Sequence, residues 1–98
     1  MSISYIKRIL NGENGAVVAF YRSYSPRILR YLSKKLPRYE DAQELTNDVF
    51  LEAIDSLSVL RKEENVSAWL YRIAHNKMVD FYRKKKIKSI FLSQAPYL

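Results

Sequence analysis

The sequence predicts an all-α protein, a compact bundle of about four helices. Only two glycines and three prolines occur in 98 residues, which is too few turn formers for a sandwich or barrel of many short strands. Apolar residues instead recur with helical spacing in four stretches of the chain. Because 48% of the residues are hydrophobic, a chain of this length can build one core, and we expect a single compact unit.

The first two helices are predicted before Pro37. Tyr5, Ile6, Ile9 and Leu10 recur at helical spacing, and Asn11-Gly12 is typical of a helix end. A second apolar series comprises Val17, Phe20, Tyr21, Tyr24, Ile28, Leu32 and Leu36. Pro26 is expected to kink or restart this helix.

The third helix is predicted to start at Asp41, because Asp41 and Glu44 have the spacing of a capping box. Its apolar series comprises Ala42, Leu45, Val49, Phe50, Ala53, Ile54 and Leu57. Residues 58–65 show no sustained period and are expected to form a long loop, of the kind that often carries function.

The last helix is predicted to be capped by Ser67 and to run at least to the basic cluster at residues 83–86. Its apolar stripe comprises Leu70, Ile73, Ala74 and Phe81. The tail from Ile87 to Leu98 contains apolar residues but no clear period.

Charge is segregated along the chain. The overall net charge is +7, but residues 1–39 carry +7, residues 40–64 carry −6 and residues 65–98 carry +6. An acidic helix between two basic ones indicates two different partners, one of them a polyanion such as nucleic acid or an anionic membrane surface. The alternative is that the acidic helix pairs with its basic neighbours inside the domain, and charge alone leaves both readings open.

One side of the last helix combines cations with groups able to contact bases. At about 100° per residue, this side gathers Arg72, His75, Asn76, Val79, Arg83 and Lys86, opposite the apolar stripe. Cations neutralise phosphates, while amides and flat rings read or stack on bases. The alternative is an ordinary solvated face, in which Tyr71, Phe81 and Tyr82 are structural and Trp69 is a packing anchor.

Catalysis and metal binding find little support in the sequence. There is no cysteine, one histidine cannot anchor a transition metal, and no glycine-rich phosphate loop is present. Glu44, Asp48 and Glu52 form a ladder of carboxylates without a histidine. We therefore expect no enzyme activity, no metal and no cofactor. The sequence has neither a membrane-spanning segment nor a signal peptide, so we expect a cytoplasmic protein without stable membrane insertion.

Two stretches in this order and separation resemble a known family. Asp41 to Ile54 reads DAQELTNDVFLEAI, and Ser67 to Lys86 reads SAWLYRIAHNKMVDFYRKKK. Together they resemble conserved region 2 of the sigma-70 family of bacterial transcription initiation factors, and most of all its extracytoplasmic-function (ECF) group. Gly12, Phe20, Tyr21 and Tyr24 also fit the pattern of this group, so the resemblance covers about residues 3–88.

The resemblance implies two binding surfaces and a base-capturing loop. Polymerase binding, at the clamp helices of the β′ subunit of core RNA polymerase, is implied for Glu44, Asn47, Asp48 and Leu51. Contact with minus-ten promoter DNA is implied for the last helix, at Arg72, His75, Asn76, Lys77, Asp80, Arg83, Lys84, Lys85 and Lys86. Capture of a flipped base of the non-template strand is implied for the loop Leu60, Arg61, Lys62, Glu63, Glu64, Asn65, Val66 and Ser67.

The chain departs from the family pattern at some positions. His75 stands where the family often has Arg, and Lys77 replaces a commonly apolar residue, so we expect its ammonium to snorkel to the surface. We expect residues 1–88 to form the region 2 domain and residues 89–98 to start an interdomain linker or tail. The second domain, which in this group reads the minus-thirty-five element, is absent from this sequence, and we expect the chain to be a truncated piece that holds region 2 only.

The resemblance implies a domain that binds core RNA polymerase and recognises and melts the minus-ten element. Anti-sigma proteins commonly hold factors of this group, so such a partner is also implied. The first alternative is an independent helical regulator that places its last helix in the major groove of double-stranded DNA. The second is a helical interaction module held by an anti-sigma protein or lying on an anionic membrane.

Overall fold

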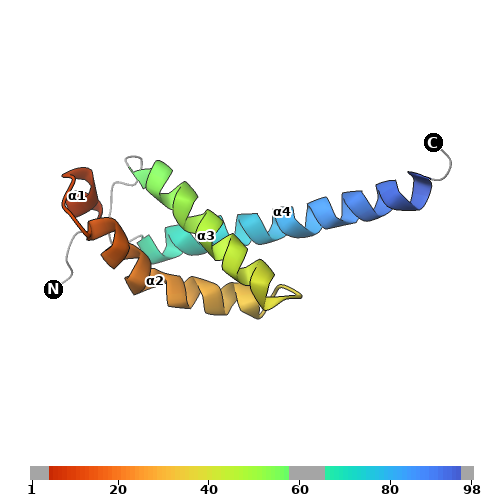
Figure 1. Ribbon diagram of the computed structural model, residues 1–98, viewed down its shortest axis with the longest axis horizontal. Helices are drawn as coiled ribbons and strands as arrows, with labels where there is room; N and C mark the ends of the chain where they lie inside the picture. The colour runs from red at the N-terminus through yellow and green to blue at the C-terminus, as the bar shows by residue number, and fades with distance from the viewer. Residues whose placement is uncertain (1–4, 58–65, 96–98) are drawn as a thin grey trace.

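The computed structural model describes residues 5–57 and 66–95, and it confirms the all-α prediction. Four helices follow one another: α1 (Tyr5–Leu10), α2 (Ala16–Ser33), α3 (Tyr39–Asp55) and α4 (Val66–Gln94). Figure 1 shows α2 and α3 as a hairpin, with α4 crossing behind α3 and extending far beyond the other helices. The described residues contain no strand.

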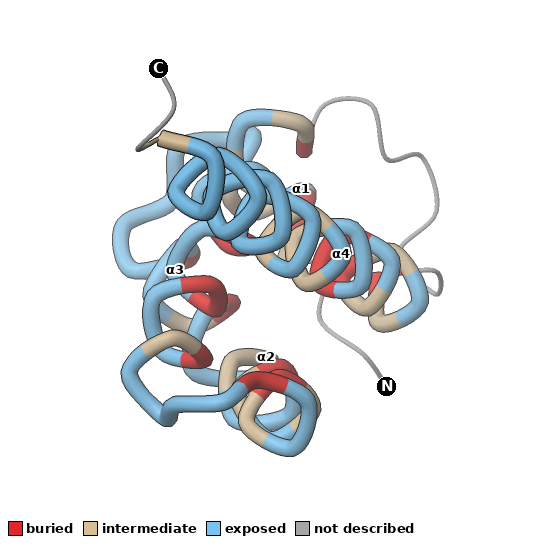
Figure 2. Tube along the Cα trace, turned by 90° about the vertical axis from the view of Figure 1, so that its right-hand side faces the viewer, coloured by how far each residue is buried: buried red, intermediate tan, exposed pale blue. Residues whose placement is uncertain are grey.

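The core lies where one side of each long helix meets the others. Figure 2 shows the buried segments of α2, α3 and α4 facing one another. Phe20 of α2 is fully buried and its ring lies 5.6 Å from that of Phe50 of α3, edge to face. Leu70 of α4 is also fully buried. Such rings and branched side chains dominate the energy of a small core, and here they fix the orientation of the three helices.

The first two helices largely match the sequence prediction. Gly12, the second residue after α1, adopts φ +73°, a left-handed conformation that favours glycine and ends the helix as predicted. The helix α2 ends at Ser33 and not at Leu36, although Leu36 is buried. Because Leu36 precedes Pro37, the helical conformation is disfavoured there, so its apolar side chain reaches the core from a turn.

Pro26 lies inside α2 and does not restart it. A proline within a helix removes one backbone hydrogen bond and usually bends the helix. Figure 1 shows α2 changing direction along its length. Of the two outcomes expected at Pro26, a kink or a restart of the helix, α2 shows the kink.

Both predicted caps are wrong. The N-cap of α3 is Arg38, with extended φ −127° and ψ 144° and no side-chain hydrogen bond, and Asp41 lies within the first turn. There its carboxylate favours the helix through the positive end of the helix dipole. Ser67 is the second residue of α4, because Val66 is already helical with its side chain buried against the core.

The helix α4 continues well past the basic cluster, to Gln94. It passes residue 88, where the sequence predicts the domain to end, without interruption; that boundary stays a prediction. Figure 2 shows the last turns exposed all round. The extension gives the described chain dimensions of 59 × 24 × 22 Å.

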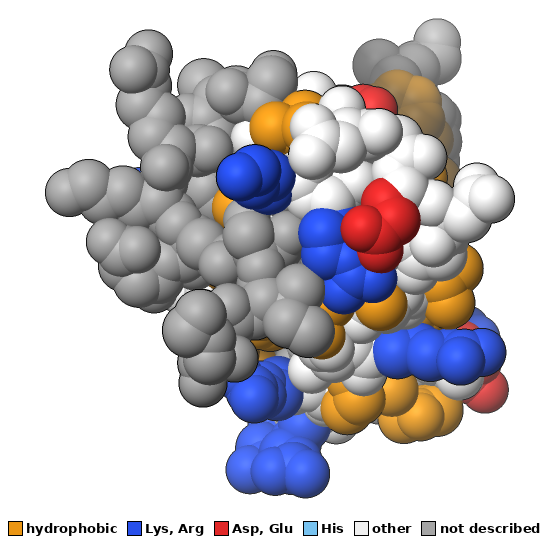
Figure 3. Space-filling model, turned by 90° about the vertical axis from the view of Figure 1, so that its left-hand side faces the viewer, with side chains coloured by type: hydrophobic (Ala, Val, Ile, Leu, Met, Phe, Trp, Pro, Cys, Tyr) orange, Lys and Arg blue, Asp and Glu red, His pale blue; other side chains and the backbone are white. Residues whose placement is uncertain are grey.

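The opposite end of the molecule, where α1 lies, has a mixed surface. Figure 3 shows basic side chains separated by hydrophobic patches on this face, with acidic side chains few. Near α1 in the sequence, Glu13 accepts a 2.6 Å hydrogen bond from Nε of Arg8. The most acidic element, α3, is thus flanked by strongly basic ones, as the charge blocks predict.

Candidate protein and nucleic-acid interfaces

The four residues predicted to bind polymerase lie together on the exposed side of α3. They are Glu44, Asn47, Asp48 and Leu51, and spacings of three and four residues align them along one strip, here called the α3 face. Leu51 is 67% exposed and borders the exposed side chains of Asn47 and Asp48 on the same helix. The α3 face thus combines an apolar side chain with two carboxylates.

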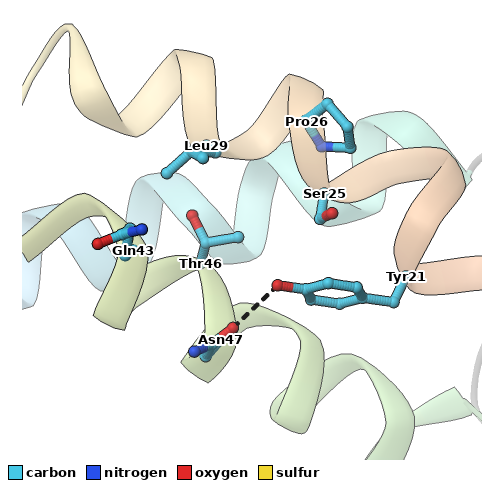
Figure 4. Close-up of a pocket in the computed structure, with 7 residues that line it drawn as sticks. All are labelled: Tyr21, Ser25, Pro26, Leu29, Gln43, Thr46 and Asn47. Atoms are coloured by element: carbon cyan, nitrogen blue, oxygen red, sulfur yellow. Dashed lines mark hydrogen bonds between the residues drawn. The ribbon is translucent and has the colours of Figure 1, made fainter. Parts of the chain in front are cut away.

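Asn47 is held in place by α2. The Tyr21 hydroxyl donates a 3.1 Å hydrogen bond to Oδ1 of Asn47, and the Tyr21 ring stands edge-on to Phe50 at 5.1 Å. Figure 4 shows this bond at one end of a pocket of about 260 Å³ between α2 and α3, with the Asn47 amide nitrogen pointing away from Tyr21. The amide therefore has a fixed orientation.

A larger apolar groove of about 440 Å³ adjoins the α3 face. It is lined by Val17, Val18, Phe20, Tyr21, Arg22, Asn47, Phe50, Leu51 and Ile54. Val17 and Val18 are 44% and 51% exposed, although Val17 belongs to the apolar series that predicts α2. Spacing alone gives no signal for this exposure, since neighbouring helical residues point about 100° apart and one core can bury both, as it buries Ile73 and Ala74.

The three exposed carboxylates of the acidic ladder differ in their partners. Glu52 forms a 2.8 Å ion pair with Nζ of Lys77 on α4, while Glu44 and Asp48 form no ion pair with any described residue. The hydrogen bond with Glu52 raises the pKa of Lys77, and burial opposes it in part. Pairing of the acidic helix with a basic neighbour inside the domain is therefore confirmed for Glu52, whereas Glu44 and Asp48 face outward.

The predicted two-sided character of α4 is confirmed. Leu70, Ile73 and Ala74 are buried. The exposed residues on the other side, here called the α4 face, are Arg72, His75, Asn76, Val79, Arg83 and Lys86. Trp69 packs partly buried against the core, as expected of an anchor, and so does Phe81.

Not every predicted DNA-binding residue lies on the α4 face. Lys77 points to α3 through its pair with Glu52, and Asp80 forms a 2.5 Å ion pair with Arg83. Lys84 and Lys85 are exposed but, at about 100° per residue, point to other sides of the helix than Lys86. Cations therefore surround α4 where it leaves the bundle.

His75 connects the α4 face to α2. Its Nδ1 lies 3.5 Å from the hydroxyl of Tyr31, whose ring meets that of Tyr71 edge to face at 5.4 Å. The Tyr82 hydroxyl donates to the backbone oxygen of Lys35. These tyrosines thus have structural roles, and they place the basic end of α2 beside α4.

Most residues of the predicted base-capture loop lie outside the described part of the chain. Leu60, Arg61, Lys62, Glu63, Glu64 and Asn65 lie outside the described residues. Val66 and Ser67 belong to the first turn of α4, where Val66 is buried and Ser67 half-buried. Base capture by this segment stays a prediction.

The described part of the chain contains neither a metal-binding cluster nor a membrane-spanning helix. No group of three or more histidine, cysteine, aspartate or glutamate side chains is arranged there to hold a metal ion. None of the helices is both long and apolar enough to cross a membrane. The surfaces of interest are therefore the α3 face with its groove and the α4 face.

Comparison with known proteins gives a family match for most of the chain. Residues 20–87 match the family described as sigma-70 region 2. Over 64 residues, covering 65% of the chain, it is 36% identical to the RNA polymerase sigma factor YlaC of Bacillus subtilis. It is 33% identical over 84 residues, 83% of the chain, to the ECF RNA polymerase sigma factor SigW of Bacillus subtilis. No solved structure gives a significant match.

A third relative is the ECF RNA polymerase sigma factor BldN of Streptomyces coelicolor, 26% identical over 84 residues and 85% of the chain. The matched segments span 37% of YlaC, 43% of SigW and 32% of BldN, so the chain corresponds to less than half of each relative. The family match covers α3 and nearly all of α2, together with α4 as far as Ile87. The chain therefore belongs to the sigma-70 region 2 family and resembles the members found in ECF sigma factors.

Proposed function

We propose that this chain is a non-enzymatic transcription initiation domain that binds the β′ clamp helices of core RNA polymerase and engages the minus-ten element. The observation that carries the proposal is that two surfaces of opposite charge, one acidic and one basic, lie on different helices. The α3 face presents Glu44 and Asp48 without internal ion pairs, and the α4 face presents an exposed row of cations. Two partners of opposite charge fit this arrangement.

The α3 face suits a basic, amphipathic helix. Its exposed leucine, Leu51, borders the apolar groove, so an apolar side chain of a partner helix can be buried while cations beside it meet Glu44 and Asp48. Interfaces of this kind derive affinity from a buried apolar anchor and orientation from the surrounding charges. The clamp helices are the partner that membership of the family suggests.

The α4 face suits promoter DNA. Arg72, Arg83 and Lys86 can neutralise phosphates, and the exposed amide of Asn76 can read a base edge. Capture of unpaired bases by the segment before α4 would give melted DNA more binding free energy than duplex. Binding would then shift the promoter towards the open state without any covalent chemistry.

A selection experiment tests the proposal. Core RNA polymerase is mixed with this chain and a pool of single-stranded oligonucleotides randomised in a short central window, and the retained strands are sequenced. We expect enrichment of a defined motif when polymerase and chain are both present, and none with polymerase alone. Recovery of an unenriched pool by the complete mixture would contradict the proposal.

A further inference from the structure

A basic hollow on α2 lies outside both surfaces described above. It has a volume of about 390 Å³ and is lined by Arg27, Arg30, Tyr31, Lys34, Lys35 and Tyr71. Arg27, Arg30 and Tyr31 belong to α2, Lys34 and Lys35 directly follow its last residue, Ser33, and Tyr71 belongs to α4. The lining thus contains cations and tyrosines and no carboxylate.

The tyrosines give the hollow a fixed frame. Tyr31 and Tyr71 are both half-buried against the core, and their rings meet edge to face at 5.4 Å. Nζ of Lys35 lies 5.3 Å from the centre of the Tyr31 ring. Because packing holds both rings, a ligand would meet them without a large cost in side-chain ordering.

The cations of the hollow have no internal acidic partner. Arg27, Arg30, Lys34 and Lys35 are exposed, and none of them forms an ion pair with a described residue. Spacings of three and four residues hold Arg27, Arg30 and Lys34 on one side of α2, where like charges repel. An anion bound in the hollow would relieve this repulsion.

The hollow is continuous with the α4 face. The Tyr31 hydroxyl contacts His75 at 3.5 Å, and His75 is exposed beside Arg72 and Asn76 on α4. A strand lying along the α4 face could therefore pass over His75 to the cations of α2. Cations combined with accessible aromatic rings are typical of surfaces that bind single-stranded nucleic acid.

A membrane fits this hollow less well. Helices that lie on anionic membranes insert an exposed apolar side into the acyl region, whereas the lining here consists of cations and tyrosines. The exposed apolar residues of α2 include Val17 and Val18, which line the groove towards α3.

We infer that the basic hollow is a second nucleic-acid-binding site, which holds backbone phosphates of single-stranded promoter DNA and places a sugar or base against Tyr31 and Tyr71. It extends the DNA-binding surface from α4 onto α2. The inference rests on the proposed function for the identity of the strand.

The test uses NMR titration of the isotopically labelled chain with a short single-stranded oligothymidine at low salt. We expect saturable shifts at the amides of Arg30, Tyr31 and Lys34 together with those at Arg72 and Asn76. Shifts on α4 alone would overturn the inference while leaving the proposed DNA-binding face standing. The absence of shifts on both helices would overturn the inference and also contradict DNA binding by the α4 face of this chain.

Matched variants measure the contribution of the hollow. Arg30→Gln should weaken oligothymidine binding and lower the slope of log affinity against log salt by about 0.7, the value for one phosphate contact on a single strand. Arg22→Gln removes the same charge from the same helix, but Arg22 lines the groove on the α3 side, so it should change the slope far less. Equal effects of the two variants would overturn the inference, as would tighter binding to phosphatidylserine vesicles than to oligothymidine.

Discussion

At the scale of single residues, some charged side chains on the surface of this domain form ion pairs within it and others do not. Glu52 with Lys77 and Asp80 with Arg83 form ion pairs within the domain, whereas Asp48 remains available to a partner. Exposed ion pairs add little to stability, about 0–1 kcal/mol each, so these pairs act mainly by fixing where the side chains point. The pair with Glu52 therefore makes Lys77 less available to a DNA phosphate than Arg72, which forms no ion pair with a described residue.

Asn76 and Lys85 should affect DNA binding in different ways. Asn76→Ala should weaken binding to preferred promoter sequences selectively, because its exposed amide is the base-reading group that we propose for the α4 face. Lys85→Ala should weaken all sequences about equally and lower the salt slope. Both effects can be measured by fluorescence anisotropy with the polymerase-bound chain. Equal losses for every sequence with Asn76→Ala would remove this residue from the base readers.

Lys77 should contribute less to DNA binding than its neighbours. The carboxylate of Glu52 holds its ammonium and raises its pKa, so Lys77 stays charged and engaged at neutral pH. Lys77→Gln should therefore lower the salt slope for DNA by less than Arg72→Gln does, measured with the same oligonucleotide. A larger effect at Lys77 would show that the ammonium leaves Glu52 for a phosphate.

At the scale of elements, the sequence predicts the side of a helix better than its ends. The apolar periods place the buried sides of α3 and α4 correctly because burial in one core imposes the period. The caps at Asp41 and Ser67 are wrong because each helix begins before its cap signal, α3 at the exposed Tyr39 and α4 at the buried Val66. The groove between α2 and α3 could not be foreseen, since it depends on how two helices lie together.

The end of α4 shows why the period disappears after Ile87. Ile87, Ile90, Phe91 and Leu92 are each about half exposed, and no core selects a side for them. A helical segment that gains little from packing is held mainly by continuity with the preceding turns.

Hydrogen exchange should distinguish the two parts of α4. Amides between residues 70 and 80 should exchange slowly, because one side of this stretch of α4 packs in the core. Amides between residues 87 and 94, where the helix is exposed, should exchange much faster by local opening. The measurement is native-state exchange followed by NMR. Equal protection along the whole helix would show that something covers the end of α4 in solution.

The apolar groove between α2 and α3 can be tested by placing a charge in it. Val18→Asp should weaken binding to the β′ clamp helices about tenfold or more, because it places a charge in the apolar groove. Since Val18 is 51% exposed, the melting temperature should change little. Binding measured by calorimetry, together with thermal unfolding, checks both statements. A clear loss of stability with unchanged binding would place Val18 in the fold and not in the interface.

At the scale of the whole molecule, one small core must hold three helices in fixed relative positions. Leu32 is fully buried in α2, and truncating such a leucine typically costs about 2–5 kcal/mol. Leu32→Ala should therefore lower the urea midpoint substantially with an unchanged m-value. Because total stabilities of small domains are about 5–15 kcal/mol, a change below about 1 kcal/mol would contradict this description of the core.

The central claim is that the α3 face binds the clamp helices of polymerase, and the most direct measurement is binding of the chain to a purified β′ clamp-helix fragment. Wild type is compared with Asp48→Arg, and with Glu13→Arg as a control that makes the same charge change at the α1 end of the molecule, where Glu13 pairs with Arg8. We expect saturable binding by wild type and Glu13→Arg and none by Asp48→Arg. Absence of binding by the folded wild type, or unchanged binding by Asp48→Arg, would contradict the account.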